Sequence, residues 1–309
     1  MLTKNNKVHS LEKIFTLIIG AQKSGTTTMH NLLSSHPEIS VPKIKETHYF
    51  SKKSLYEEGI DWYYSHFNLK KKAMCEVDPS YLFFPKSAQR IKESLPNSKF
   101  IVIFRKPIDR ALSQYLMSCY RGYETLSFLD ALKSEEERLK NDKNQFSFIN
   151  HSYLHRGNYV AQLDQYLSIF NKSNFLFIKF DDFISDNKNK NLLKSICTFI
   201  DIDFTLLQLR LSKSNTKKKI KSTMIRNLLY EETFFKKAAQ FAVPSDRIRN
   251  KLKSVINSLN SSSYDEDESK HKINENLQSL PQEYIDWNNK QTKLLSKISN
   301  LDLDDWIYT

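Results

Sequence analysis

Short apolar runs alternate along the chain with segments whose apolar residues recur at helical spacing. Runs rich in β-branched and aromatic residues predict buried strands at Phe15–Ile19, Phe100–Phe104 and Phe175–Phe180. Helical spacing is found in the segments Thr26–Leu33, Leu55–Phe67, Ser87–Leu95, Ser127–Lys140, Lys188–Ile200 and from Asn289 onward. This alternation predicts an α/β fold, with a central, mainly parallel β-sheet flanked by helices on both faces.

A tight polar turn joins the first predicted strand to the first predicted helix. Gly20 and Gly25 permit the backbone angles and close approach that such a turn needs. The first amides of the helix have no partners of their own, and the positive end of the helix dipole faces the same mouth. A cation and four hydroxyls are added by Lys23, Ser24, Thr26, Thr27 and Thr28. The turn is therefore predicted to bind an anion.

The lysine of this turn occupies a different position from the lysine of nucleotide triphosphatases. In the Walker A loop the lysine follows the second glycine, whereas here Thr26 follows Gly25 and Lys23 precedes it by two residues. A P-loop kinase or nucleotidase is therefore disfavoured, although Asp181 and Asp182 follow a predicted strand as such an enzyme requires. A glycine turn without a ligand is the simplest alternative.

A second anion element is predicted after the strand Phe100–Phe104. The strand delivers Arg105 to its carboxyl end, Pro107 opens a helix, and Ser113 lies further along that helix. Ligands of parallel sheets bind outside the carboxyl ends of strands, so Arg105 and Ser113 can reach one anion. Arginine suits a phosphate because its planar fork pairs two oxygens at once.

Three motifs in this order resemble those of sulfotransferases that use 3′-phosphoadenosine 5′-phosphosulfate (PAPS). Gly20–Thr27 resembles their 5′-phosphosulfate loop, and Arg105–Ser113 resembles their 3′-phosphate element, Arg-x-Pro-x-x-Arg-x-x-Ser. Between them, Lys45–Phe50 resembles the Lys-Glu-x-His-x-Phe motif of the carbohydrate-type enzymes, which include the heparan sulfate enzymes and bacterial relatives. The resemblance implies the P-loop-like sulfotransferase fold.

The resemblance also implies roles for single residues. Glu46 matches the glutamate that takes the proton from the acceptor, and a carboxylate within hydrogen-bond reach suits that task. His48 is a second candidate base or an acceptor contact, with a packed core histidine as the alternative. Lys23 is expected to stabilise the charge that grows on the leaving oxygen. The choice between Glu46 and His48 stays open.

Weaker resemblances extend over much of the chain. Glu76–Tyr81 matches a Glu-x-x-Pro-Ser-Tyr element on the acceptor side, and Arg156–Leu163 matches a segment that implies Tyr159 lies beside the nucleotide. The basic stretch Lys217–Ser222 matches a loop that closes over the 3′-phosphate, with Lys219 and Lys221 as candidate contacts. Trp306 resembles the terminal tryptophan of bacterial members.

The implied function is transfer of a sulfuryl group from PAPS, as co-substrate, to a hydroxyl or amine acceptor on a carbohydrate or glycolipid. No metal is expected, because no carboxylate pair or histidine cluster stands at ligand spacing. A P-loop kinase and a non-catalytic polyanion-binding protein are the alternatives. The acceptor, the sulfated position and the oligomeric state stay open.

The composition shows an excess of basic residues and indicates where in the cell the protein is expected. The 309 residues include 47 basic and 35 acidic ones, for a net charge of +12, which suits a polyanionic partner, although nucleic acid is not expected. The longest apolar runs fall short of the ~20 residues of a membrane span, and residues 1–13 lack the apolar core of a signal peptide. A cytoplasmic protein is expected. The three cysteines fit neither a disulfide framework nor a zinc site.

The domain prediction is a loose leader at 1–13 and one sulfotransferase domain at 14–309. Within it, residues 213–309 are expected to form a basic loop and a C-terminal helical part, with a serine- and acid-rich linker at Asn260–Lys270.

Overall fold

The computed structural model describes residues 14–185, 189–207, 218–220, 261–263, 277 and 280–309. These residues fall into two compact units. The first takes its residues from Met1–Ala111, Leu154–Lys213 and Gln282–Thr309, and the second from Leu112–Tyr153 and Ser214–Pro281. The expected leader lies outside the described residues, and one domain over 14–309 stays a prediction.

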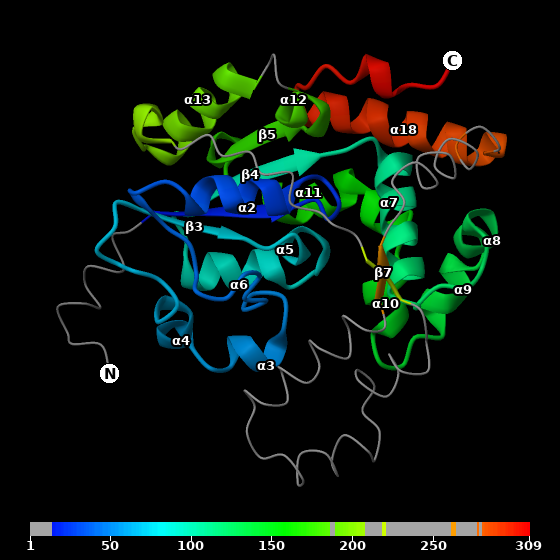
Figure 1. Ribbon diagram of the computed structural model, residues 1–309, viewed down its shortest axis with the longest axis horizontal. Coiled ribbons are helices and arrows are strands. Elements are labelled where there is room, and N and C mark those ends of the chain that lie inside the picture. Colours follow the sequence, from blue (N-terminus) through cyan, green and yellow to red (C-terminus); the bar gives the residue numbers. More distant parts are fainter. Residues whose placement is uncertain (1–13, 186–188, 208–217, 221–260, 264–276, 278–279) are drawn as a thin grey trace, which may run out of the picture. The chain divides into compact units, whose positions relative to one another are not determined.

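A five-stranded parallel sheet forms the centre of the first unit (Figure 1). Its strand order is β2-β3-β1-β4-β5, and every neighbouring pair is parallel. The strands are β1 (Phe15–Gly20), β2 (Ile39–Ser40), β3 (Ala73–Val77), β4 (Lys99–Phe104) and β5 (Phe175–Lys179). The predicted parallel sheet is thus confirmed, and β1 and β4, which carry the two predicted anion elements, are neighbours.

Helices cover both faces of this sheet. The helices of the first unit are α2 (Thr26–Ser34), α3 (Lys53–Tyr56), α4 (Ile60–Tyr64), α5 (Ser80–Phe83), α6 (Ser87–Ser94), α11 (Tyr159–Leu167), α12 (Phe180–Ile184), α13 (Asn189–Ile200) and α18 (Gln282–Ser299), with 3-10 turns at His155–Gly157, Lys172–Asn174, Phe204–Leu206 and Asp304–Trp306. Strand side chains alternate between faces, so Leu17 belongs to a core with residues of α4, α5, α6, α11 and α18, whereas Ile18 belongs to a core with residues of α2, α12 and α13. Two separate apolar cores follow.

Several predicted helices differ from the structure at identifiable residues. The aromatic segment Leu55–Phe67 forms two short helices, because Gly59 takes a left-handed backbone (φ 83°) between α3 and α4. Helix α18 begins at Gln282 rather than Asn289, directly after Pro281, a residue that suits a helix start.

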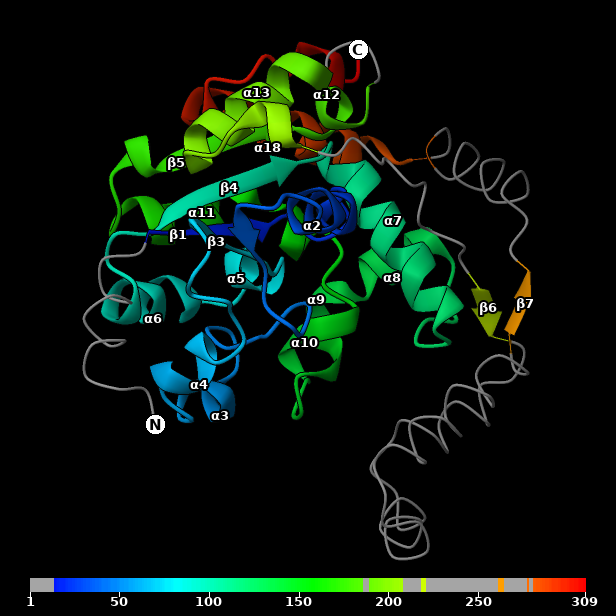
Figure 2. The ribbon, with the colours of Figure 1, turned by 60° about the vertical axis from the view of Figure 1, so that its left-hand side comes forward.

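The second unit contains helices and a short pair of antiparallel strands (Figure 2). Helix α7 (Pro107–Tyr120) begins in the first unit and ends in the second, which also holds α8 (Phe128–Lys133), α9 (Glu135–Lys140) and α10 (Phe146–Asn150). The predicted single helix Ser127–Lys140 is broken at Ser134, whose hydroxyl donates to the Asp130 carbonyl oxygen at 2.8 Å and ends α8.

Strands β6 (Lys218–Ile220) and β7 (Ser261–Ser263) pair antiparallel, with Lys218 opposite Ser263. They correct two predictions, since Lys217–Ser222 was expected as a loop and Asn260–Lys270 as a linker. The rest of both segments lies outside the described residues. Among the residues that the structure describes, none belongs to a helix that is both long and apolar enough to cross a membrane.

Candidate functional site

The turn between β1 and α2 has the geometry of an anion loop. Gly25 precedes the first residue of α2 with φ 79°, and the Met29 amide donates to its carbonyl oxygen at 3.0 Å. A Cβ on Gly25 would meet the Phe180 ring at 3.1 Å, so both the backbone angle and the space favour glycine. No acidic side chain stands in the first turn of α2, so its amides and dipole stay available to an anion.

The side chains of this loop divide by burial. Ser24 and Thr26 are buried, whereas Lys23, Thr27 and Thr28 are half-buried. Lys23 takes a left-handed backbone with φ 73°, which costs a non-glycine residue about 1–2 kcal/mol. Such strain is retained where the surrounding structure fixes it, and here it sits on the one cation that the motif supplies.

Arg105 contacts this loop directly. Its Nη1 donates to the backbone oxygen of Lys23 at 3.2 Å, and its guanidinium lies 5.0 Å from the centre of the Phe180 ring. The sheet explains the approach, because β4 lies beside β1 and the Ala21 amide donates to the Ile103 carbonyl oxygen at 2.8 Å. The structure therefore brings the two predicted anion elements together at Lys23 and Arg105.

Tyr159 supports Arg105 from α11. Its side chain is buried against Phe104, and its hydroxyl donates to the Arg105 carbonyl oxygen at 2.8 Å. Burial raises the pKa of Tyr159 to about 12, so the phenol stays protonated and able to donate. Whether Tyr159 also touches a nucleotide stays a prediction.

The structure says less about the three other predicted 3′-phosphate contacts, Ser113, Lys219 and Lys221. Ser113 is a half-buried residue of α7 and belongs to the second unit, so its joint action with Arg105 stays a prediction. Lys219 lies in β6, and Lys221 lies outside the described residues. The roles of Lys219 and Lys221 likewise stay predictions.

The Lys45–Phe50 motif lies against the anion loop. Lys45 Nζ donates to Thr27 Oγ1 at 2.9 Å and lies 3.5 Å from Glu46 Oε1. The Glu46 side chain is 31% exposed, and both Glu46 (φ 57°) and His48 (φ 55°) take left-handed backbones. The two candidate bases thus stand on one strained turn that a lysine ties to the loop.

Glu76 anchors this turn from the carboxyl end of β3. Its buried carboxylate accepts hydrogen bonds from the Thr47 amide (3.1 Å) and hydroxyl (2.6 Å) and from the hydroxyls of Tyr63 (2.8 Å) and Tyr81 (3.0 Å). Burial, with a smaller contribution from the charge of Asp78, raises the pKa of Glu76 to about 7.

Asp78 holds the next residue of the turn. Its Oδ2 accepts from the His48 amide at 2.8 Å and lies 3.1 Å from His48 Nδ1. Burial lowers the pKa of His48, whereas the hydrogen bond and the charge of Asp78 raise it. Together the two effects of Asp78 outweigh burial, so the net shift of the pKa is upward. From the sequence, Glu76–Tyr81 was predicted only to border the acceptor, and the contact of Asp78 with His48 was missed. The sequence feature that could have indicated Asp78 is an acidic residue directly after a buried strand.

Asp181, which could have served a kinase, has a structural partner. Trp306 Nε1 donates to its Oδ2 at 2.9 Å, and Trp306 itself is buried. The carboxylate therefore holds the C-terminal turn against α12. Of the two aspartates that the kinase alternative could use, Asp181 and Asp182, the first is thus already engaged with Trp306.

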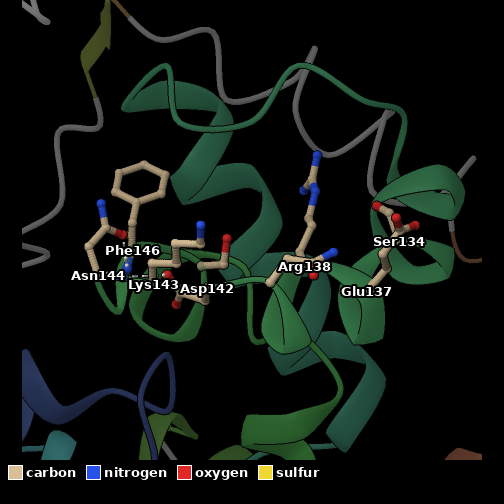
Figure 3. Close-up of a pocket in the computed structure, with 9 residues that line it drawn as sticks. Ser134, Glu137, Arg138, Asp142, Lys143, Asn144 and Phe146 are labelled. Carbon is tan, nitrogen blue, oxygen red and sulfur yellow. Dashed lines mark hydrogen bonds between the residues drawn. The ribbon is translucent and has the colours of Figure 1, made fainter.

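The second unit contains a separate open pocket of about 620 Å³ (Figure 3). In the close-up Arg138 lies between Glu137 and Ser134 on one side and Asp142, Lys143, Asn144 and Phe146 on the other. Buried Glu124 pairs with Arg138 and also accepts from the Tyr153 hydroxyl at 2.8 Å. The lining mixes both signs of charge and includes none of the predicted site residues.

Comparison with known proteins agrees with this geometry. A family model described as "Sulfotransferase domain" matches residues 14–255. The chain is 39% identical over 107 residues to the membrane-associated sulfotransferase kil1 of Dictyostelium discoideum, covering 33% of this chain and 22% of that protein. It is 29% identical over 177 residues to heparan sulfate glucosamine 3-O-sulfotransferase 6 of Homo sapiens, covering 55% of this chain and 47% of that protein.

These matches span less than half the length of both curated relatives. The fold is also found in the crystal structure of a sulfotransferase from Alicyclobacillus acidocaldarius, with a TM-score of 0.64 at 22% identity over 95% of this chain and 98% of that one. The resemblance drawn from the motifs and the predicted fold are therefore confirmed, and the chain belongs to the sulfotransferase domain family.

Proposed function

We propose that this chain transfers a sulfuryl group from PAPS to a hydroxyl or amine of a carbohydrate or glycolipid acceptor. The observation that carries the proposal is the hydrogen bond from Arg105 to the Lys23 backbone oxygen. It puts a phosphate-binding fork beside an anion loop, which suits a nucleotide with anionic groups at both its 5′ and 3′ positions.

The donor-binding residues follow from this arrangement. Lys23, the amides at the start of α2 and the hydroxyls of Ser24, Thr26, Thr27 and Thr28 hold the phosphosulfate, with Gly25 giving the loop its shape. Arg105 holds the 3′-phosphate, supported by Tyr159. The motif resemblance makes Ser113, Lys219 and Lys221 further candidate contacts of the 3′-phosphate. The half-buried lysine and the acid-free helix start fit an anion of this kind.

The chemistry assigned to the chain is charge stabilisation and proton removal. Lys23 stabilises the negative charge that grows on the leaving oxygen, a gain larger in the transition state than in the ground state. Glu46 and His48 are the two groups able to take the acceptor proton, and the contact between Lys45 and Thr27 keeps their turn against the loop. No metal has a part in this mechanism.

The acceptor class rests on the relatives. Several of the matched proteins, including the human one, carry names that state action on heparan sulfate, which is a polysaccharide. A basic chain with net charge +12 suits an anionic saccharide. Location in the cytoplasm stays a prediction from the sequence, and one relative is named as membrane-associated.

The test is transfer of ³⁵S from labelled PAPS to a panel of saccharides, glycolipids and small phenols. We expect labelled saccharide or glycolipid product with the unaltered chain, and a loss of about 10²-fold or more in kcat with Lys23→Ala. Lys53→Ala is the matched control, because Lys53 is an exposed lysine of the same unit. Absence of product from every acceptor, or Lys53→Ala as harmful as Lys23→Ala, would contradict the proposal.

Two other functions are tested by the same preparation. A P-loop kinase would need Mg²⁺ and bind ATP as well as it binds PAPS. A polyanion-binding protein without activity would bind heparin with strong salt dependence and release no labelled product.

A further inference from the structure

The backbone and the ring of His48 are both held in place by a buried carboxylate. Its backbone is left-handed, which a non-glycine residue adopts only when other contacts hold it. The contact here is the hydrogen bond from its own amide to Asp78 Oδ2 at 2.8 Å. A fully buried carboxylate therefore fixes both the backbone and, through Nδ1, the ring of this histidine.

The hydrogen-bond geometry decides which ring nitrogen carries the proton. Asp78 Oδ1 accepts from the Ser80 amide at 3.0 Å, and Oδ2 accepts from the His48 amide. Both oxygens thus act as acceptors, so the group 3.1 Å from Oδ2 must be a donor, which is Nδ1–H. In a neutral imidazole with Nδ1–H, the other nitrogen, Nε2, has the free lone pair of a base.

Glu46 is placed differently. Its carboxylate is 31% exposed and lies 3.5 Å from the ammonium of Lys45, whose side chain is itself 35% exposed. His48 is 30% exposed at the side chain, so its ring is open to a substrate while Asp78 is not exposed at all. Of the two candidate bases, His48 is the one that the fold orients.

We propose that Asp78 is a positioning residue that sets the Nδ1–H tautomer of His48, and that His48 Nε2 is the base for the acceptor. The proposal rests on the proposed sulfuryl transfer. As the acceptor oxygen forms its bond to sulfur, Nε2 takes the acceptor's proton. The bond between sulfur and the bridging phosphate oxygen breaks, and its electron pair leaves on that oxygen, beside Lys23.

The charged groups around His48 define its pH response. Asp78, from the end of β3, and Glu46, from the same turn, favour the protonated ring, whereas Lys52, just before α3, disfavours it. Removing the charge of Asp78 therefore lowers the pKa of His48. The acid limb of the activity profile, which reports deprotonation of the base, moves to lower pH in Asp78→Asn.

The first measurement needs no variant and no activity. Long-range ¹H–¹⁵N NMR of the imidazole nitrogens, on the unaltered full chain, reports the tautomer of His48 directly, with His48→Gln for assignment. We expect a protonated Nδ1 and an unprotonated Nε2 above the pKa. A protonated Nε2 overturns the proposal whether or not sulfuryl transfer is found.

The second measurement is a mutant cycle with pH–rate profiles. We expect Asp78→Asn to lower kcat about 10²-fold or more, to move the acid limb down by about one pH unit, and to leave KM for PAPS within about 3-fold. His48→Gln and the double variant should then lose about the same, because Asp78 acts through His48. Asp61→Asn, an exposed aspartate of α4, is the control for charge.

Outcomes that overturn the proposal are additive losses in the double variant, or an acid limb that Asp78→Asn leaves in place. Abolition of the acid limb by Glu46→Gln, with retention in His48→Gln, would make Glu46 the base instead. Failure of the unaltered chain to transfer sulfate to any acceptor would instead defeat the proposed function, and the NMR result would still decide the role of Asp78.

Discussion

Arg105 donates a hydrogen bond from Nη1 to the backbone oxygen of Lys23 at 3.2 Å. The two residues are 82 positions apart in the sequence, and they meet because β1 and β4 are neighbours whose carboxyl ends share one edge of the sheet. The contact links the guanidinium that would bind one phosphate to the loop that would bind the other anionic group.

Arg105→Ala should weaken binding of PAPS more than it slows the chemical step. Loss of charge-assisted hydrogen bonds costs roughly 1.5–3 kcal/mol, which corresponds to a KM for PAPS about 10- to 100-fold higher. The KM of Arg105→Lys for PAPS should lie between those of the unaltered chain and Arg105→Ala, because lysine keeps the charge but lacks the planar guanidinium that pairs two oxygens. Initial-rate kinetics measure both, with exposed Lys92→Ala as control. An unchanged KM for PAPS in Arg105→Ala would contradict the assignment.

Gly25→Ala should destabilise the fold. Gly25 has a left-handed backbone (φ 79°, ψ 15°), in which a Cβ is strained, and the added Cβ would also meet the Phe180 ring at 3.1 Å. We expect a loss of about 1–3 kcal/mol from urea denaturation. A variant as stable as the unaltered chain would refute the close packing.

Stability should fall with pH because of Glu76. Its folded pKa, raised from 4.5 to about 7 by burial, means that the folded state binds the proton more tightly than the unfolded chain does. Its contribution is therefore fully present below the ordinary glutamate pKa and is lost as pH rises from about 4.5 to 7, on the order of 3 kcal/mol in all.

Glu76→Gln removes this titration and should flatten that part of the profile. Urea denaturation of both proteins between pH 5 and 7.5 measures the difference, and the shared contribution of His48 cancels. Parallel stability curves for the two proteins would show that Glu76 titrates normally.

Asp181→Asn should leave sulfuryl transfer within about 3-fold and reduce stability by no more than about 1 kcal/mol. Asparagine keeps an acceptor oxygen for Trp306 Nε1 but loses the charge, and residue 181 is exposed, so the hydrogen bond is weakened and not lost. Rates and denaturation of the same preparation measure both effects. A loss of transfer beyond about 10²-fold, with stability retained, would show that Asp181 takes part in catalysis.

The sheet was predictable because its strands are buried on both faces and appear as continuous apolar runs. Helix boundaries depended on single residues, such as Gly59 and Ser134, whose effect competes with the periodicity around them. β6 and β7 carry lysine and serine, which give no strand signal.

The candidate site was predictable as motifs but not as contacts. Spacing placed Lys23 and Arg105 at strand ends, and only the strand order showed that these ends are adjacent. The anchoring of Thr47 by Glu76 and of His48 by Asp78 joins residues about thirty positions apart, which no local pattern specifies. The link between Lys45 and Thr27 was missed for the same reason.

In the proposed mechanism one nucleotide spans the loop at Lys23 and the guanidinium of Arg105. Isothermal titration calorimetry with adenosine 3′,5′-bisphosphate and with adenosine 5′-monophosphate tests it most directly. The account predicts that the bisphosphate binds about 10²-fold more tightly to the unaltered chain, and that Arg105→Ala removes most of that difference while Lys53→Ala keeps it. Equal affinities for the two nucleotides, or a difference that survives Arg105→Ala, would contradict it.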